Sequence, residues 1–600
     1  MKIKVSDYIA SFIASIGVKE VFLIPGGVNT NLVDSIARNE ELSYVCNHHE
    51  QACAISAESY SRINNNIGVC VVTVGPGVTN TITGIAGAWL DSIPTLYISG
   101  QVKRGDMIIN SGSKVRQLGV QELDPIKLVQ SITKYAEVVM DPNDIKYHLQ
   151  KAVYVAKNGR PGPVYLDIPS DVLGSFVEEG ELRSFDEVLK KDDFLISGGL
   201  SKDIGDLIDL LKQSKRPVIF AGHGIRLSQG QEIFLELVNK LNIPVLTTMS
   251  AHDLIPTKHS LYIGRPGVFG DRAGNFAIQN CDLLISIGAR HHLWNIGYNY
   301  EEFARNAKKI VIDIDEEELN KKTVIPNVPI CVDAKKFMYA MLQIVDFSLL
   351  PDISEWIKVC QGWKQKYPVV LPEYANEKEY VNSYYFTDVL SSLLVEKDVI
   401  VTGVGTSFTG TLQCFKTKKD QRLISNVGCA AMGYDLPASI GACFANKKKR
   451  VILITGDGSI MMNLQELQTI VHYKLPIKIF LINNKGYLAI KNTQNNFFDG
   501  RLNAVDEKSG VTFPDFKKIA MAFGIEYEKI ENHNNMENII KNVLQSSGSI
   551  ICEINMSPNQ PLLPKVYSQK NSDGSMESKP LEDMYPFLDR DEFLSNMTNK

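Results

Sequence analysis

The chain has 600 residues, of which 44% are hydrophobic and 22% charged, and a formal net charge of −5. This length suits about three or four ordinary domains, and the composition is that of a globular protein. The small net charge gives no reason to expect nucleic acid or an anionic membrane as a partner. Ten cysteines without a CxxC or CxxxC pair favour reduced thiols in the cytoplasm over a disulfide framework or a zinc site.

The first part of the chain, residues 1–177, alternates helical and buried-strand patterns. Helical spacing of apolar residues occupies 8–15, 52–61 and 82–89, and short β-branched runs occupy 20–24, 69–74 and 95–99. Such alternation predicts a parallel sheet covered by helices on both faces. The charged, turn-rich stretch that follows, 178–202, is typical of a linker.

Two further units of similar length follow the linker. The middle unit spans 203–345, and we expect strands at 217–221, 244–248, 283–287 and 310–314. A proline-containing connector leads to a third unit at 381–560, and a polar stretch at 561–600 predicts an arm or lid. We therefore predict an α/β protein with three doubly wound parallel-sheet domains and a C-terminal arm.

The third unit contains the pattern that carries most chemical information. A β-branched run at 451–455 predicts a strand that ends in a tight turn at Gly456-Asp457-Gly458-Ser459. A crossover helix at 464–472 and a second strand at 477–482 then lead to Asn483-Asn484. Neighbouring parallel strands would deliver a carboxylate and an amide oxygen to the edge where open α/β sheets bind ligands. One carboxylate with neutral oxygens suits Mg²⁺, which also takes ligands from phosphates.

Gly-Asp-Gly followed by Asn-Asn at this spacing resembles the signature of thiamine-diphosphate (ThDP) enzymes. The resemblance implies Asp457, Asn484 and the backbone carbonyl of Gly486 as ligands of Mg²⁺. A lone Gly-Asp-Gly would instead fit an ordinary βαβ unit with glycine turns. The distant segment His48-His49-Glu50-Gln51-Ala52 resembles the catalytic glutamate motif of the same enzymes. It implies that Glu50 relays a proton to the cofactor; alone, Glu50 would be a helix acid stabilised by the dipole.

Three such units, with Glu50 in the first and Asp457 in the last, resemble the acetolactate synthase large-subunit branch of this family. In that branch the first unit binds the pyrimidine ring and the third binds the diphosphate. The resemblance implies that the cofactor lies between the first unit of one subunit and the third unit of another. It therefore implies a homodimer, or a homotetramer, that decarboxylates pyruvate or a similar 2-oxo acid and transfers the two-carbon unit to a carbonyl acceptor.

The resemblance also gives further residues a role. Gly27 and Gln121 would contact the reacting substrate. The Ala430 carbonyl and Met432 would hold the cofactor rings in their bent arrangement, since an unbranched thioether side chain fits between rings without strain. The remaining ThDP-binding residues, which cradle the diphosphate or line its exit turn, would be Gly405, Thr406, Ser407, Gly456, Gly458, Ser459 and Tyr487.

The middle unit raises the question of a flavin, because acetolactate synthases hold FAD there. Glycine-rich turns after two predicted strands suit close approach to a phosphate. Acidic side chains after other strands suit ribose hydroxyls, and an arginine suits a pyrophosphate. The alternative is a middle unit without a ligand. The predicted FAD residues are Arg160, Gly222, His223, Gly224, Gly288, Ala289, Arg290, Asp313 and Asp333.

Three departures from the acetolactate synthase pattern concern the acceptor. Trp294 stands where the synthases have an arginine for the acceptor carboxylate, and a tryptophan ring cannot make that bidentate contact. Val120 replaces a phenylalanine, and Thr493 lies near the position of a tryptophan that selects acceptor size. An acetolactate-synthase-like enzyme of a polysaccharide locus, with a keto-sugar nucleotide as acceptor, is one interpretation. A simple 2-oxo acid decarboxylase and an inactive cofactor-binding subunit are others.

Overall fold

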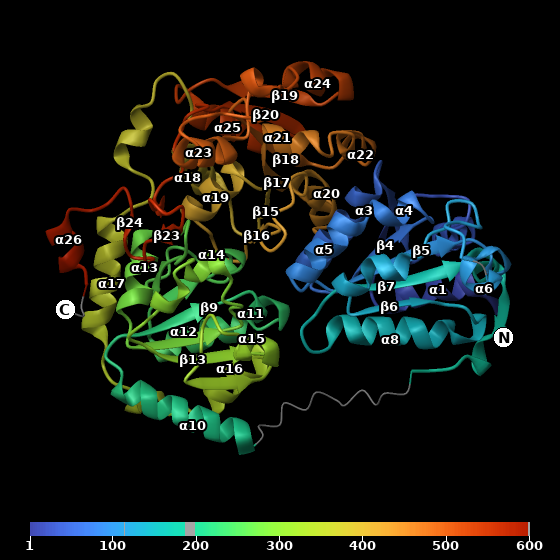
Figure 1. Cartoon of the computed structure of the whole chain (residues 1–600), viewed down its shortest axis with the longest axis horizontal. Helices are drawn as coiled ribbons and strands as arrows, with labels where there is room; N and C mark the ends of the chain where they lie inside the picture. The colour runs from blue at the N-terminus through green and yellow to red at the C-terminus, as the bar shows by residue number, and fades with distance from the viewer. Residues whose placement is uncertain (113, 186–197, 598–600) are drawn as a thin grey trace.

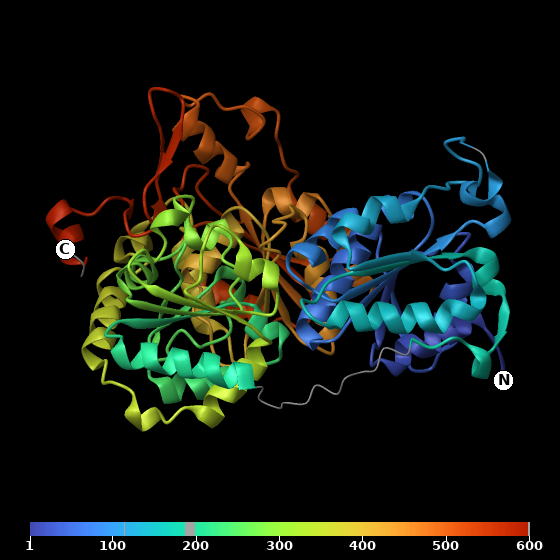
Figure 2. The same cartoon turned by 60° about the horizontal axis from the view of Figure 1, so that its bottom comes forward.

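The computed structural model describes residues 1–112, 114–185 and 198–597. Residues 186–197 of the expected linker and 598–600 of the expected arm lie outside the described residues. Figures 1 and 2 show three lobes, which follow one another along the chain, and a C-terminal segment that returns to the middle lobe. Each lobe is built on one six-stranded sheet in which every pair of strands is parallel. The predicted fold class is confirmed.

The sheet of the first unit has the order β3-β2-β4-β5-β7-β6. Its strands are β2 (Glu20–Leu23), β3 (Ser43–Cys46), β4 (Gly68–Val72), β5 (Thr95–Gln101), β6 (Tyr135–Val138) and β7 (Val164–Pro169), and short β1 (Lys2–Lys4) pairs antiparallel with β8 (Phe176–Glu178). Its helices are α1 (Val5–Ser15), α2 (Thr30–Arg38), α3 (Glu50–Asn64), α4 (Pro76–Thr79), α5 (Ile82–Leu90), α6 (Ile108–Ser111), α7 (Pro125–Val129), α8 (Ile145–Lys157) and α9 (Ser170–Gly174).

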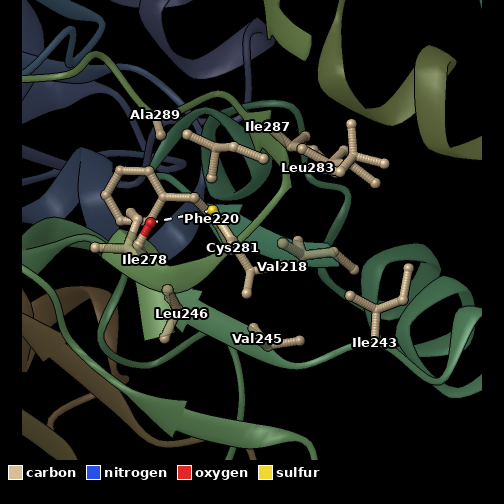
Figure 3. Close-up of a cluster of buried hydrophobic side chains, with 14 of the residues drawn as sticks. Val218, Phe220, Ile243, Val245, Leu246, Ile278, Cys281, Leu283, Ile287 and Ala289 are labelled. Carbon is tan, nitrogen blue, oxygen red and sulfur yellow. Dashed lines mark hydrogen bonds between the residues drawn. The ribbon is translucent and has the colours of Figure 1, made fainter. Parts of the chain in front are cut away.

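The middle sheet has the order β11-β10-β9-β12-β13-β14. Its strands are β9 (Pro217–Ala221), β10 (Val245–Thr247), β11 (Tyr262–Gly264), β12 (Leu283–Ile287), β13 (Lys308–Asp313) and β14 (Val328–Cys331). The helices are α10 (Gly198–Gln213), α11 (Gly224–Leu227), α12 (Gln231–Leu241), α13 (Arg272–Asn280), α14 (Leu293–Ile296), α15 (Glu316–Asn320), α16 (Ala334–Ile344) and α17 (Ser354–Lys366). Figure 3 shows how side chains of β9, β10 and β12 pack together in its core.

The third sheet has the order β16-β15-β17-β18-β20-β19, which repeats the topology of the first. Its strands are β15 (Val399–Thr402), β16 (Arg422–Ile424), β17 (Val451–Gly456), β18 (Ile477–Asn483), β19 (Glu526–Ile530) and β20 (Ile550–Asn555). The helices are α18 (Ser383–Leu393), α19 (Thr406–Cys414), α20 (Asp435–Ala445), α21 (Asp457–Met461), α22 (Glu466–His472), α23 (Leu488–Phe497), α24 (Phe516–Phe523) and α25 (Met536–Gln545). The expected tight turn at Gly456-Asp457-Gly458 is instead the start of α21.

The first and third units share one hydrophobic core. Helices α3 and α20 pack against each other, and buried side chains of both sheets join the same cluster. A Cβ on Gly441 of α20 would clash with the backbone of Ser56 in α3, so the two helices approach at backbone distance. The same chain therefore holds its first and third units in a fixed relation.

The C-terminal segment lies on the middle unit rather than extending away from it (Figure 1). It contains β21 (Lys565–Val566), β22 (Ser568–Lys570), β23 (Met576–Ser578), β24 (Met584–Tyr585) and α26 (Arg590–Ser595). Val566 and Leu581 enter the core of the middle unit. The Asn275 side chain donates to the Leu581 carbonyl at 2.8 Å, and the Trp363 indole N–H donates to Asn596 at 2.9 Å.

Candidate functional site

The carboxyl ends of β17 and β18 bring an acid and an amide together. Asp457 opens α21 after β17, and its Oδ2 accepts backbone N–H groups of Asn484 at 3.0 Å and Gly486 at 3.3 Å. Burial raises the pKa of Asp457 to about 7, although these N–H groups oppose the shift. The Asn484 Nδ2 lies 3.4 Å from the Thr406 hydroxyl at the start of α19. Three neighbouring strands thus converge on one point.

The Asn484 side-chain oxygen has the property expected of a metal ligand. It is buried and has no hydrogen-bond partner among the described residues. A buried polar oxygen without a partner is costly, so such an atom calls for a ligand that the protein itself does not provide. The neighbouring Asp457 carboxylate and Asn484 oxygen fit Mg²⁺, which needs few protein ligands when a phosphate supplies others.

The turn before α20 and the first turn of α21 bring most of the remaining third-unit residues together. The Gly433 N–H donates to the Ser459 hydroxyl at 2.9 Å, and this hydroxyl donates to Asp435 at 3.0 Å. A Cβ on Gly458 would lie 3.7 Å from the Met432 sulfur and 2.5 Å from the Tyr487 ring. Only glycine therefore fits between Met432 and Tyr487.

The helix starts at Gly405 and Gly456 present backbone N–H groups to the same edge. Gly405 has φ +69° and precedes α19, whose first residues are Thr406 and Ser407. Gly456 precedes α21. Ala430 adopts the left-handed region with φ +51°, which turns the chain just ahead of Met432. The free N–H groups of a helix start favour an anion such as a diphosphate.

The predicted residues of the first unit are Glu50, Gly27 and Gln121. Glu50 is the first residue of α3, and its Oε2 accepts from the Asn80 side chain at 2.9 Å. Gly27 lies exposed between β2 and α2, and Gln121 is exposed with φ +61°. Among the residues that the structure describes, no hydrogen bond or ion pair joins Glu50 to Asp457 or Asn484.

A buried carboxylate that the sequence did not reveal holds the segment carrying Gln121. Asp167, at the end of β7, accepts from the hydroxyl of Ser99 and, at 2.9 Å, from the side chain of Gln101. The same Gln101 amide donates to the Leu123 carbonyl at 3.1 Å. Burial raises the pKa of Asp167 to about 7. Asp167 thus ties the end of the first sheet to the loop that presents Gln121.

We expect the replacement Asp167→Asn to stabilise the protein at alkaline pH. Folded Asp167 keeps a proton that the unfolded chain releases above about pH 4, so stability falls as pH rises from about 4 to about 7. An asparagine keeps both hydrogen bonds without that penalty. Urea unfolding should show a gain about 1–3 kcal/mol larger at pH 8 than at pH 5. An equal effect at both pH values would contradict this account.

A cavity of about 460 Å³ opens where the strand order of the middle sheet reverses, between β9 and β12. This is the position at which doubly wound sheets bind nucleotides. Of the predicted FAD residues, Arg160, His223, Gly224, Gly288, Arg290, Asp313 and Asp333 line it. Gly222 and Ala289 do not: a Cβ on Gly222 would clash with the Ala289 backbone, so they pack the two turns together.

The cavity has polar walls from two units. Arg160 lies 3.0 Å from Asp315 and 2.9 Å from Glu318, so its charge is partly neutralised before any ligand binds. Burial raises the pKa of Asp313 to about 6. The buried Nδ1 of His223 has no partner among the described residues, and burial lowers its pKa to about 3. A neutral imidazole nitrogen and a buried acid are available to a ligand.

Apart from Arg160, sequence reasoning missed the first-unit side of this cavity, which includes Asp91, Ser92 and Lys157. Asp91 and Ser92 follow helix α5 without a strand or glycine signal, so their position depends on how the first unit docks.

The three predicted acceptor residues differ in how far one chain buries them. Trp294 is half-buried, and its ring lies 5.8 Å from that of Phe408 in α19 and 6.4 Å from that of Phe269. It thus lies between the middle and third units, near the helix that starts at Thr406. Val120 is 82% exposed, and Thr493 is exposed on α23.

The described residues offer neither a cluster of metal-binding side chains nor a membrane-spanning helix. They contain no group of three or more His, Cys, Asp or Glu residues that could hold a metal ion. The acid–amide pair described above has one carboxylate and so does not belong to that class of site. In the same part of the chain, none of the helices has the length and apolarity needed to cross a membrane.

The chain is similar to known proteins over nearly its whole length. Residues 3–128, 204–341 and 403–554 match the N-terminal TPP binding, central and C-terminal TPP binding domains of thiamine pyrophosphate enzymes. The acetolactate synthase large subunit of Porphyra purpurea is 34% identical over 567 residues, 93% of this chain and 92% of the relative. The chain belongs to the thiamine pyrophosphate enzyme family.

Other relatives point to the same branch of this ThDP family. The acetolactate synthase large subunit of Lactococcus lactis is 32% identical and covers 95% of both chains. Acetolactate synthase 1 of Zea mays, a chloroplastic protein, is 30% identical over 94% of this chain and 87% of its own length. The protein is a ThDP-dependent enzyme of the acetolactate synthase type, as the sequence motifs predicted.

Proposed function

We propose that the protein is a Mg²⁺- and ThDP-dependent carboligase. It decarboxylates pyruvate, or a similar 2-oxo acid, and transfers the two-carbon unit to a carbonyl acceptor. The observation that carries this proposal is the Asp457–Asn484 pair, in which the Asn484 oxygen is buried without a partner. Asp457, Asn484 and the Gly486 carbonyl would hold Mg²⁺ against a diphosphate whose oxygens face the starts of α19 and α21.

The remaining residues would act on the rings and on the proton. When bound, ThDP supplies an electron sink for the charge left by loss of CO₂. Met432 would support the cofactor rings from one side, beside Tyr487, and the Ala430 carbonyl would accept from the amino group of the pyrimidine. Glu50 would exchange a proton with the pyrimidine nitrogen, while Asn80 orients its carboxylate through Oε2.

We further propose that a second copy of the chain completes the site, in a homodimer or homotetramer. The support is that Gly27, Val120, Gln121 and Thr493 are all exposed in one chain. Residues that bind substrate must be shielded from water in the working enzyme. A second copy that brings its first unit against the third unit described here would cover them and would supply Glu50.

Trp294 bears on the identity of the acceptor substrate. Trp294 offers an aromatic ring near α19 where an arginine would bind a carboxylate, and a ring suits stacking on a sugar. This favours a keto-sugar nucleotide as a second candidate acceptor beside pyruvate.

Product analysis tests the reaction and the acceptor together. The enzyme is incubated with pyruvate, ThDP and Mg²⁺, with and without a panel of keto-sugar nucleotides, and products are identified by mass. A product heavier than one panel member by the two-carbon unit supports the sugar acceptor. Acetolactate from pyruvate alone supports a synthase, and free acetaldehyde alone would contradict a carboligase.

We also propose that the central cavity holds FAD. The support is its position at the reversal of strand order and the unpartnered His223 nitrogen within it. We expect the purified protein to be yellow, with the visible absorption band of a flavin that is released on denaturation. A colourless protein whose melting temperature does not rise when FAD is added would contradict this expectation.

A further inference from the structure

The turn that carries Ala430 and Met432, residues 426–434, is fastened to the first unit at both ends. At its near end the Gly428 N–H donates to Asp91 Oδ1 at 2.8 Å, and the Asn426 side chain donates to Asp91 Oδ2 at 3.4 Å. At its far end the Tyr434 hydroxyl donates to Glu58 Oε2 at 2.8 Å. Both anchoring groups are carboxylates of the first unit: Glu58 lies on α3, and Asp91 directly follows α5.

A single buried arginine lies between these two carboxylates. Arg62 donates through Nε to Glu58 Oε1 at 2.6 Å and through Nη2 to Asp91 Oδ2 at 2.6 Å. Arg62 is 5% exposed, Glu58 1% and Asp91 8%. Water screens such charges little, so each carboxylate is held firmly in place by the guanidinium. The arginine therefore fixes the distance between the two anchoring points of the turn.

The near end of the turn also packs closely against the C-terminal part of helix α5. A Cβ on Gly428 would lie 2.6 Å from Asp91 Oδ1 and 2.9 Å from the Leu90 Cβ. A Cβ on Gly87 would lie 2.8 Å from the Asn426 side chain. The absence of side chains at these two positions lets the turn settle onto α5. Between its ends, the Ala430 N–H donates to the Asn426 carbonyl at 2.7 Å.

We infer that Arg62, Glu58 and Asp91 are positioning residues for the cofactor rings, acting through the turn 426–434. The three side chains do not touch the diphosphate site, which the third unit builds alone from Asp457, Asn484 and Thr406. They fix the position of Ala430 and Met432 relative to that site. The inference rests on the proposed function, because it takes Ala430 and Met432 to hold the rings of ThDP.

Because the turn would contact the rings of ThDP and not its diphosphate, changes in the turn should weaken the binding of ThDP but not that of inorganic diphosphate. Asp91→Asn removes the charge that Arg62 holds, and Gly428→Ala pushes the turn away from α5 without changing any charge. Tyr434→Phe removes a single hydroxyl and is the mildest of the three. Asp398→Asn is the matched control. It breaks the ion pair of Asp398, which lies just before β15, with Arg450, at the end of the strands opposite to the site.

The dissociation constants of ThDP and of inorganic diphosphate are measured calorimetrically with saturating Mg²⁺ on full-length variants whose circular dichroism matches that of the wild type. We expect each turn variant that folds to bind ThDP about tenfold more weakly or worse, and diphosphate within about twofold of the wild type. The control should bind both ligands normally.

Two results would overturn the inference: unchanged ThDP affinity in the turn variants, or an equal loss of ThDP and diphosphate affinity. Tyr434→Phe keeps the test decisive if the other variants do not fold, because it removes no charge and no volume from the backbone contact. Failure of the wild type to bind either ligand would instead contradict the proposed function, so the two failures are distinguishable.

Discussion

Glu50→Gln is expected to lower turnover by about a hundredfold or more while leaving the affinity for ThDP within about twofold of the wild type. The glutamine side chain has the same shape, and its oxygen can still accept the hydrogen bond that Asn80 donates to Glu50. It cannot, however, give up or take a proton at the pyrimidine nitrogen. Binding and chemistry should therefore separate in this variant.

Two measurements on the same protein decide this prediction. CO₂ release from pyruvate reports turnover, and calorimetric titration with ThDP in excess Mg²⁺ reports binding. Glu20→Gln is a suitable control, because Glu20 is a partly buried glutamate at the start of β2. That control should keep nearly full activity. Wild-type turnover in Glu50→Gln would remove Glu50 from the mechanism.

Asp457→Asn is expected to weaken Mg²⁺-dependent ThDP binding by about a hundredfold or more. Asp457 would supply the only side-chain charge that faces the metal in the third unit, and its loss leaves a buried cation without a counter-charge. Removing one partner of a buried ion pair costs about 3 kcal/mol or more, which corresponds to this factor. An asparagine oxygen in the place of Oδ2 can still accept from the Asn484 and Gly486 N–H groups, and the hydrogen bond from the Gly458 N–H is lost.

Titration of the variant with ThDP over a range of Mg²⁺ concentrations tests this prediction. Circular dichroism establishes that the fold is intact, and Asp398→Asn controls for the loss of a buried aspartate in the same sheet. Binding of ThDP by Asp457→Asn with wild-type dependence on Mg²⁺ would show that the metal lies elsewhere.

Much of the fold could be predicted because parallel strands buried on both faces are continuous apolar runs. The bounds of β9 and β12 coincide with the runs at 217–221 and 283–287. Such runs carry no information about strand order, so only the structure shows that the middle sheet has a different topology. The C-terminal segment reads as polar because only isolated residues, such as Leu581, enter the core.

The candidate site was predictable where chemistry depends on local sequence. Asp457 and Asn484 each follow a strand directly, so their convergence follows from strand adjacency. The residues that we infer to position Ala430 and Met432 were not predicted, because Arg62 within α3 and Asp91 after α5 have no local sequence signal. Their role arises from the docking of the first unit on the third, which is a property of packing rather than of sequence pattern.

The acceptor residues could not be placed together by either route. Val120 and Thr493 are exposed in one chain, so no packing within the chain defines their surroundings. Trp294 alone has a defined environment, between Phe269 and Phe408. Its half-buried ring follows from the meeting of the middle and third units, which a single sequence does not reveal.

The central claim is that Glu50 of one copy and Asp457 of another serve the same active site. Co-expression of Glu50→Gln and Asp457→Asn chains with different affinity tags, followed by purification through both tags, yields mixed dimers and tests this claim directly. Each variant alone should be nearly inactive, whereas a mixed dimer contains one site with both residues intact and should show about half of wild-type turnover. Mixed dimers no more active than the two parent variants would contradict a site shared between copies.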